Sequence, residues 1–417
     1  VIMKSIRLIY SSLKNNTYAK DFIFFSIGYF LCSLISLINL HLINKNLVPE
    51  ELGRFSYFKS LFELLASILS LNLYGAYLRF NNKGFNPTVQ SLVIKHLLCA
   101  FSILSLIYFV LTKEWTTILF AFILFSNERS YYFRSLLKMK ELNIQRVIAV
   151  LVTLLVTIFI VLFQNKDGVV SAYIILISYS LGYATCFWFY RSKYNSESFV
   201  KEQVRYSILL KFCFPAALLI IVDWSLNYTS QLLIKNEFGY TELAPYAVAQ
   251  NALSSIKLFT GLFLMFYPSL YYKEIEKGNI STIRLSRNLV MFVLLFIVLA
   301  LCFFTKQIYM LLGASAYIAF DIYFKLLLFV EFFKVSSSFF AIYLSYQLRT
   351  FTSFCIMSSG AILNVALLFL FLHKYGIIFA CYSSMLSFAI IFAINFFYSK
   401  RLETKFIQER TMTNFQG

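Results

Sequence analysis

The feature that most constrains the fold of this chain is a succession of twelve long apolar stretches. They lie near residues 22–43, 55–80, 91–111, 115–137, 144–164, 168–190, 207–234, 245–272, 288–305, 320–346, 351–372 and 376–397. Stretches of about 20 apolar residues are typical of helices that cross the hydrocarbon core of a bilayer. Charged residues make up only 13% of the chain, about half the fraction found in soluble domains. The sequence therefore predicts an all-α integral membrane protein with about 12 transmembrane helices.

Positive charge alternates along the chain in step with these spans. An even number of spans places both ends of the chain on one side of the membrane. If that side is the cytoplasm, 25 of the 37 Lys and Arg residues fall in cytoplasmic segments, 7 in outer segments and 5 within spans. This distribution follows the positive-inside rule and predicts that both termini are cytoplasmic. The net charge of +18 then reflects membrane topology, and nucleic acid is not expected as a partner.

The first span, Phe22–Ile43, is too long for the apolar core of a secretory signal peptide, and no small-residue cleavage site follows it. We therefore expect it to stay in the protein as a membrane helix.

Ionisable residues within the middle spans are the first candidates for function. Lys211 and Asp223 lie in the span 207–234, and Lys257 lies near the centre of the span 245–272. An ionisable group at mid-bilayer is costly, so it normally faces a protein-lined or water-filled cavity. If the two spans are antiparallel neighbours, a rise of about 1.5 Å per residue brings Asp223 and Lys257 to about the same depth. This pattern predicts a polar interior.

Other spans add further charges. Lys59 and Glu63 are one helical turn apart, as are Glu331 and Lys334, so each pair shares a helix face. Arg129 lies in the polar cytoplasmic third of its span, which either lines a cavity or leaves the bilayer early. For any one of these residues, a static ion pair between helices explains the charge as well as a functional role does.

Two prolines are candidate hinges. Pro215 interrupts the span 207–234 and Pro268 lies at the end of the span 245–272. Either proline could kink a helix that must bend when the protein changes conformation, or could be an ordinary proline of a membrane helix.

The chain contains no pattern that predicts catalysis. It has no P-loop, no cysteine pair at metal-ligand spacing and no catalytic constellation, so we expect no cofactor, no metal and no enzymatic activity. Glu50 and Glu51, adjacent in the first outer loop, are typical of a solvated turn because no second acidic site accompanies them.

A short internal similarity divides the chain into halves. Lys45-Asn46 and Glu51-Leu52-Gly53, in the first outer hairpin, match Lys235-Asn236 and Glu242-Leu243-Ala244, in the hairpin between the seventh and eighth spans. Because both hairpins are predicted on the same side, the halves would be parallel repeats. We therefore predict an N-terminal lobe over 1–200 with spans 1–6, and a C-terminal lobe over 201–417 with spans 7–12 and a short basic tail.

Three short sequence motifs resemble those of a known family. They are LVPEELGRFSYFKS at the start of the second span, KFCFPA in the seventh and TELAPYAVAQ before the eighth. Together they resemble the polysaccharide-exporter branch of the multidrug/oligosaccharidyl-lipid/polysaccharide (MOP, MATE-like) superfamily, and in particular the O-antigen (Wzx-type) flippases. Pro268 fits the family pattern, whereas Ala244 stands where members usually have Gly.

The resemblance implies two pseudo-symmetric six-helix lobes around a cationic cavity that opens alternately to the two sides. It implies a flippase in the bacterial inner membrane, which moves undecaprenyl-diphosphate-linked oligosaccharide from the cytoplasmic to the periplasmic leaflet. A coupling cation, H⁺ or Na⁺, and other polysaccharide-assembly membrane proteins are further expected partners.

For that function we assign each charged candidate a role. Lys59, Arg129, Lys211, Lys257 and Lys334 would bind the anionic head group, and Glu63, Asp223 and Glu331 would be counter-ions or sites for a coupling cation.

Several alternatives remain open. They are a polysaccharide polymerase or ligase, a drug/cation antiporter of the same superfamily, a flippase for another lipid-linked glycan, and a scramblase or purely structural membrane protein. A polymerase generally needs a long outer loop with Arg and His, which this chain does not have, and an antiporter would be expected to have an acidic cavity.

Overall fold

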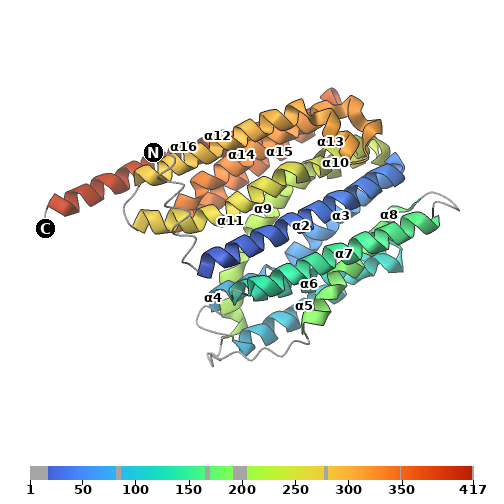
Figure 1. Cartoon of the computed structure of the whole chain (residues 1–417), viewed down its shortest axis with the longest axis horizontal. Helices are drawn as coiled ribbons and strands as arrows, with labels where there is room; N and C mark the ends of the chain where they lie inside the picture. The colour runs from blue at the N-terminus through green and yellow to red at the C-terminus, as the bar shows by residue number, and fades with distance from the viewer. Residues whose placement is uncertain are drawn as a thin grey trace. The chain divides into compact units, whose positions relative to one another are not determined.

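We describe the fold from a computed structural model, which covers residues 17–80, 86–136, 138–164, 170–190, 204–276, 280–347 and 349–415 (Figure 1). Within these residues every regular element is a helix. Each of the twelve predicted spans corresponds to one helix or to two or three consecutive helical elements, and nine helical segments of the described chain are long and apolar enough to cross a membrane. The prediction of an all-α membrane fold is confirmed.

The first six spans are formed by elements up to residue 190. These are α2 (Thr17–Asn46), α3 (Pro49–Ser70), η1 (Leu73–Gly75), α4 (Ala76–Phe80), α5 (Pro87–Thr112), η2 (Trp115–Phe122), α6 (Ile123–Ser135), α7 (Met139–Gln164), α8 (Ala172–Ala184) and η3 (Thr185–Tyr190), where η marks a 3₁₀ helix.

The last six spans begin at residue 206. Their elements are α9 (Tyr206–Phe238), α10 (Tyr240–Ala252), α11 (Ser254–Glu276), α12 (Ile280–Phe303), α13 (Thr305–Leu311), η4 (Ser315–Phe320), α14 (Asp321–Tyr346), α15 (Thr350–Tyr375) and α16 (Ile378–Phe415).

Local sequence signals set several helix ends. Asn86 caps α5 by accepting hydrogen bonds from the backbone N–H groups of Thr88 and Val89, at 3.1 and 3.3 Å, and Pro87 occupies the first helical position. Ser171 caps α8 in the same way through the N–H of Tyr173. Such caps satisfy backbone donors that a membrane helix cannot leave unpaired.

Two of the predicted spans are broken within the membrane segment. The span 55–80 ends its first helix at Ser70, because Leu71 and Asn72 adopt left-handed backbone conformations with φ of 47° and 52°. The span 245–272 is divided at Leu253, where three-residue turns replace the regular helical hydrogen bonds: the N–H of Leu253 bonds the carbonyl of Gln250, and that of Ile256 bonds Leu253. Neither break was predicted from the sequence.

The chain divides into two compact units. One comprises Val1–Leu47 and Phe58–Ala217, and the other comprises Val48–Tyr57 and Leu218–Gly417. In the first unit α2 packs along α7, which also packs against α8; in the second, α14 packs along α16, which also packs against α15 (Figure 1). Relative to the predicted lobes 1–200 and 201–417, the start of α3 is grouped with the C-terminal unit and the start of α9 with the N-terminal one.

The start of α3 belongs to the second unit because the two similar hairpins meet there. A Cβ atom on Gly53 would lie 2.0 Å from the backbone oxygen of Tyr240, so only glycine allows this approach. The Tyr240 ring lies edge-on to Tyr57, with centroids 5.7 Å apart, and the guanidinium of Arg54 lies 5.4 Å from the Tyr240 centroid. The ammonium of Lys235 lies 5.4 Å from the centroid of Tyr57. The two hairpins that resemble each other in sequence thus contact each other, with Gly53 against Tyr240 and Lys235 near Tyr57.

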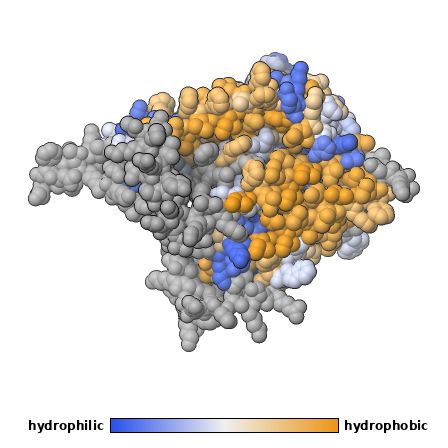
Figure 2. Space-filling model, viewed as in Figure 1, coloured by the Kyte–Doolittle hydropathy of each residue, from blue (hydrophilic) through white to orange (hydrophobic). Residues whose placement is uncertain are grey.

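Large apolar side chains cover much of the exposed surface, as the orange area of Figure 2 shows. Examples are Leu106 and Val110 of α5, Phe159 of α7, and Phe292 of α12, all at least 60% exposed. A soluble protein rarely exposes apolar area on this scale, whereas lipid covers it in a membrane.

Candidate functional site

The best candidate site is a polar face of α9 in the second unit. Asp223, Asn227 and Gln231 are four residues apart, so they follow one another along one side of the helix. The ammonium of Lys334, from α14, donates a 3.0 Å hydrogen bond to Oδ1 of Asn227 and lies 3.5 Å from Oδ1 of Asp223. We call Asp223, Asn227 and Lys334 the Lys334 cluster.

Side chains of α10 extend this cluster. The amide nitrogen of Gln250 donates to the backbone oxygen of Asn227 at 3.0 Å and to the hydroxyl of Tyr246 at 3.2 Å. Gln231 donates to the amide oxygen of Gln250. Asn227 also donates to the backbone oxygen of Asp223, so a chain of hydrogen bonds to side-chain and backbone oxygens runs along this face.

The cluster is open at one end and closed at the other. The side chains of Asp223 and Lys334 are 46% and 28% exposed, whereas Gln231 is 2% exposed. Glu331, one turn before Lys334 on α14, is buried. The Asp223–Lys334 pair is therefore the exposed part of this polar face, and Gln231 is its buried part.

The other candidates near the middle of the chain lie on exposed faces. Lys257 is exposed in the first turn of α11, directly after the break at Leu253. Lys211 is exposed on the part of α9 that belongs to the first unit. The ion pair of Asp223 in the described structure is made with Lys334.

In the first unit, Lys59 and Glu63 are both half-buried on α3. The Lys59 ammonium lies 5.0 Å from the ring centroid of Tyr179 on α8, and the Tyr179 hydroxyl accepts a 3.3 Å hydrogen bond from buried Asn39 on α2. Lys59 therefore lies where three helices of this unit meet, with its ammonium near an aromatic ring.

Arg129 lies in a closed, buried cluster. Its guanidinium is 3.4 Å from Glu128, its neighbour on α6, and the two side chains are 2% and 0% exposed. The hydroxyls of Tyr77 and Tyr190 both donate to Glu128, the first at 2.6 Å, and Arg129 lies 3.8 Å from the Tyr190 ring centroid. In this structure Arg129 is enclosed among helical segments of the first unit.

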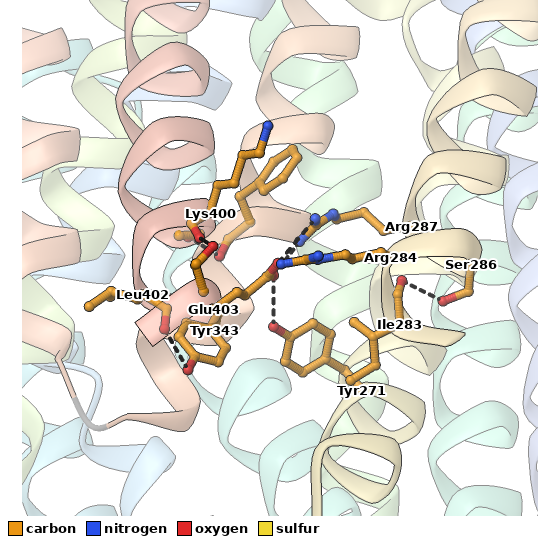
Figure 3. A network of polar contacts seen from close by, with 12 residues as sticks. Tyr271, Ile283, Arg284, Ser286, Arg287, Tyr343, Lys400, Leu402 and Glu403 are labelled. Carbon is orange, nitrogen blue, oxygen red and sulfur yellow. Dashed lines mark hydrogen bonds and ion pairs between the residues drawn. The ribbon is translucent and has the colours of Figure 1, made fainter. Parts of the chain in front are cut away.

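The second unit contains a similar buried cluster around Glu403 of α16 (Figure 3). Arg287 of α12 binds this carboxylate at 2.6 Å, Arg284 approaches it at 3.3 Å, and the Tyr271 hydroxyl donates to it at 3.4 Å. The Arg287 guanidinium also stacks on Phe340 at 4.1 Å from the centroid. Both arginines count among the cytoplasmic charges in the predicted topology.

Sequence reasoning missed the partners in both buried clusters. The signal for the first was the adjacent Glu128-Arg129 within an apolar stretch, which suits a short-range pair with tyrosines from other spans. Glu403 follows the last span and is 116 residues from Arg287, so nothing local in the sequence joins them.

The two candidate hinges lie inside helices. Pro215 is within α9, and the division between the two units falls between Ala217 and Leu218, less than one turn later. The helix that contains Pro268 continues to Glu276 and does not end at the proline. Among the described residues, no group of three or more His, Cys, Asp and Glu side chains could hold a metal ion.

Neither a family model nor a curated protein matches the chain by sequence. Solved structures do match it. An outward-facing multidrug resistance MATE family transporter of the MOP superfamily has a TM-score of 0.66 at 12% identity, over 95% of this chain and 98% of its own. The inward closed conformation of the lipid II flippase MurJ has a TM-score of 0.64 at 14% identity, over 91% and 87%.

A MOP superfamily transporter from Pyrococcus furiosus, whose title reports reverse polarity of its binding pocket, has a TM-score of 0.61 at 12% identity, over 94% and 97%. These similarities show that the chain has the fold of MOP-superfamily transporters over nearly its whole length. The predicted MATE-like fold is confirmed, and none of these three proteins is described as an enzyme. The O-antigen branch stays a prediction.

Proposed function

We propose that this protein is a flippase that moves undecaprenyl-diphosphate-linked oligosaccharide from the cytoplasmic to the periplasmic leaflet of a bacterial inner membrane. Alternating access through a cationic cavity would carry the head group, with both termini in the cytoplasm. The observation that carries the proposal is the Lys334 cluster: a partly exposed ammonium, held by polar side chains, on helices that otherwise cross a membrane.

The chemistry of such a substrate matches the cluster. Moving a charged, hydroxyl-rich head group through hydrocarbon is prohibitive unless polar groups replace its water. An ammonium binds phosphate oxygens through charge-assisted hydrogen bonds. Amide side chains such as Asn227 and Gln250 offer the donors and acceptors that sugar hydroxyls need.

We assign the head-group sites by exposure. Lys334, Lys257, Lys211 and Lys59 are each at least partly exposed and would bind phosphate or sugar in different conformations. Arg129 would contribute only in a conformation that opens its pair with Glu128. Asp223, Glu63 and Glu331 would be counter-ions, with a coupling cation as a further ligand.

The solved structures of this fold support a transporter of this kind. One is a lipid II flippase by name, and another is described as having a pocket of reversed polarity within the same superfamily. The fold thus accommodates both lipid-linked substrates and pockets of different charge. The bend needed for alternating access would occur at Pro215, beside the division of α9 between the two units.

A drug/cation antiporter is the second candidate. Asp223 is 46% exposed, so it could receive a cation if Lys334 moved away, and the MATE transporter with a similar fold is a multidrug resistance protein. The flippase proposal is preferred because this carboxylate is already paired with an ammonium.

The test is deletion of the gene in its own host, followed by analysis of surface glycan and of undecaprenyl-diphosphate-linked oligosaccharide. Loss of surface glycan with complete repeat units trapped on the cytoplasmic face would support the proposal, and the mass of the trapped lipid would identify the sugar. Unchanged glycan with raised sensitivity to cationic drugs would favour the antiporter. Single units accumulating on the outer face would indicate a polymerase.

Complementation of the deletion tests the site itself. Lys334→Met should fail to restore surface glycan at normal protein level. Lys325→Met is the matched control, because Lys325 lies on the same helix and is also paired with a carboxylate, Asp321 at 2.6 Å. Equal restoration by both variants would contradict the site assignment.

A further inference from the structure

The buried cluster around Glu403 contains one carboxylate and two guanidinium groups (Figure 3). Arg287 binds Glu403 through two nitrogens, at 2.6 and 3.5 Å, and its side chain is only 6% exposed. Arg284 reaches the same carboxylate through Nε, at 3.3 Å. One carboxylate balances one positive charge, and Arg287 is the closer and more buried partner. The cluster therefore keeps an excess positive charge at Arg284.

Arg284 is placed to bind a second anion. Its side chain is 40% exposed, and since Nε is the nitrogen that contacts Glu403, the two terminal nitrogens can bind elsewhere. At 3.6 residues per turn, Arg284 lies between the buried side of α12, which carries Arg287, and the exposed side, which carries Leu285. The excess charge is therefore at the exposed surface of α12.

Two uncharged polar side chains flank Arg284. Ser281, Arg284 and Asn288 are three and four residues apart, so they follow one another along one side of the first turns of α12. Ser281 and Asn288 are exposed, and a hydroxyl and an amide can both donate hydrogen bonds to phosphate oxygens. The N-terminal end of a helix also carries a partial positive charge. We call these three residues the polar stripe of α12.

Apolar side chains continue from this stripe along the same helix. Leu285, Leu289 and Phe292 are four and three residues apart and are 62%, 58% and 69% exposed. We call them the apolar stripe of α12. A surface that is cationic at the end of a membrane helix and apolar farther along it matches the order of head group and acyl chain in a phospholipid. In the predicted topology, this end of α12 is cytoplasmic.

We propose that the polar stripe binds the phosphate of an anionic phospholipid from the surrounding leaflet, and that the apolar stripe contacts one of its acyl chains. This lipid stays at the surface of α12 and is not a transported substrate. The inference goes beyond the proposed function and does not depend on it, because the site shares no residue with the Lys334 cluster.

The charge of the cluster selects the lipid class. With a phosphatidylglycerol bound, two guanidinium groups face one carboxylate and one phosphate, so the charges balance. A guanidinium binds phosphate oxygens through paired, charge-assisted hydrogen bonds. A phosphatidylethanolamine also has a phosphate, but its ammonium group adds a positive charge beside Arg284 and leaves the imbalance in place. Lys400, exposed on α16 one turn before Glu403, adds a further positive charge near the cluster.

The test measures the binding of two lipids to the full-length protein in detergent by native mass spectrometry. The probes are dioleoylphosphatidylglycerol, which is anionic, and dioleoylphosphatidylethanolamine, which has the same acyl chains and no net charge. We expect the natural protein to bind phosphatidylglycerol about fivefold more tightly, the scale of one partly exposed ion pair. Arg284→Gln should bind both lipids equally.

Two further variants separate this site from general attraction by charge. Ser281→Glu leaves the contact between Arg284 and Glu403 in place and supplies a carboxylate one turn before Arg284, so it should also remove the preference. Lys306→Gln is the matched control, because Lys306 is exposed beyond the opposite end of α12, on α13, and its loss should leave the preference unchanged.

Three outcomes would overturn the inference. The first is equal binding of both lipids by the natural protein. The second is a preference that survives both Arg284→Gln and Ser281→Glu. The third is an equal loss of phosphatidylglycerol binding in Arg284→Gln and Lys306→Gln, which would show that the overall charge of the protein attracts the lipid.

Discussion

The buried carboxylate of Glu403 allows a stability prediction whose size follows from the structure (Figure 3). Its side chain is 2% exposed, and that of Arg287, its main partner, is 6% exposed. Glu403→Gln keeps the shape of the side chain and removes its charge. The Arg287 guanidinium is then left buried without a counter-ion, which costs about 3–5 kcal/mol of the free energy of unfolding.

Arg284 contributes far less to the stability of this cluster than Arg287 does. Its side chain is 40% exposed, so solvent screens its interaction with Glu403, and Arg284→Gln should cost less than about 1 kcal/mol. Arg284→Gln is therefore the matched control for loss of a charge in the same cluster.

The double variant Arg287→Met with Glu403→Leu removes both buried charges and fills their volume with apolar atoms. It should be markedly more stable than Glu403→Gln alone, since a buried ion pair replaced by well-packed apolar side chains is often neutral. The assay is equilibrium unfolding in mixed detergent micelles. A cost below about 1 kcal/mol for Glu403→Gln, or a double variant no more stable than the single one, would refute this account of the cluster.

Three further predictions concern other parts of the chain. Gly53→Ala places a Cβ 2.0 Å from the Tyr240 oxygen, so the two backbones must move apart. We expect the free energy of unfolding in detergent to fall by about 1–3 kcal/mol, and an unchanged unfolding midpoint would contradict the contact. Glu128→Gln leaves Arg129 buried and unpaired in the first unit and should lower the thermal unfolding midpoint in detergent, whereas Lys113→Gln, on the exposed end of α5, should not. Lys257→Ala should reduce glycan export with normal membrane insertion, measured by surface glycan and protein level, and full export would exclude Lys257 from the site.

Much of the fold was predictable because membrane spans are encoded locally. A helix that must satisfy its own backbone in hydrocarbon needs about 20 consecutive apolar residues, so its position can be read from the sequence alone. All twelve predicted spans correspond to helices. The breaks at Leu71–Asn72 and Leu253 were not predicted, because neither position has a proline or glycine and the interruptions depend on the surrounding packing.

The candidate site, like the fold, was predictable from the sequence only in part. The sequence alone determined that Asp223, Glu331 and Lys334 lie within membrane spans, since burying charge in a bilayer is costly wherever the helices pack. Only the tertiary structure decided that Asp223 pairs with Lys334, 111 residues along the chain by the numbering (334 − 223), and that Asn227 holds the same ammonium. It also decided that Arg129 is enclosed with Glu128 and that Glu403 binds Arg287. An ion pair needs its atoms within about 4 Å, and that proximity is set by how distant helices pack, which hydrophobicity along the chain does not specify.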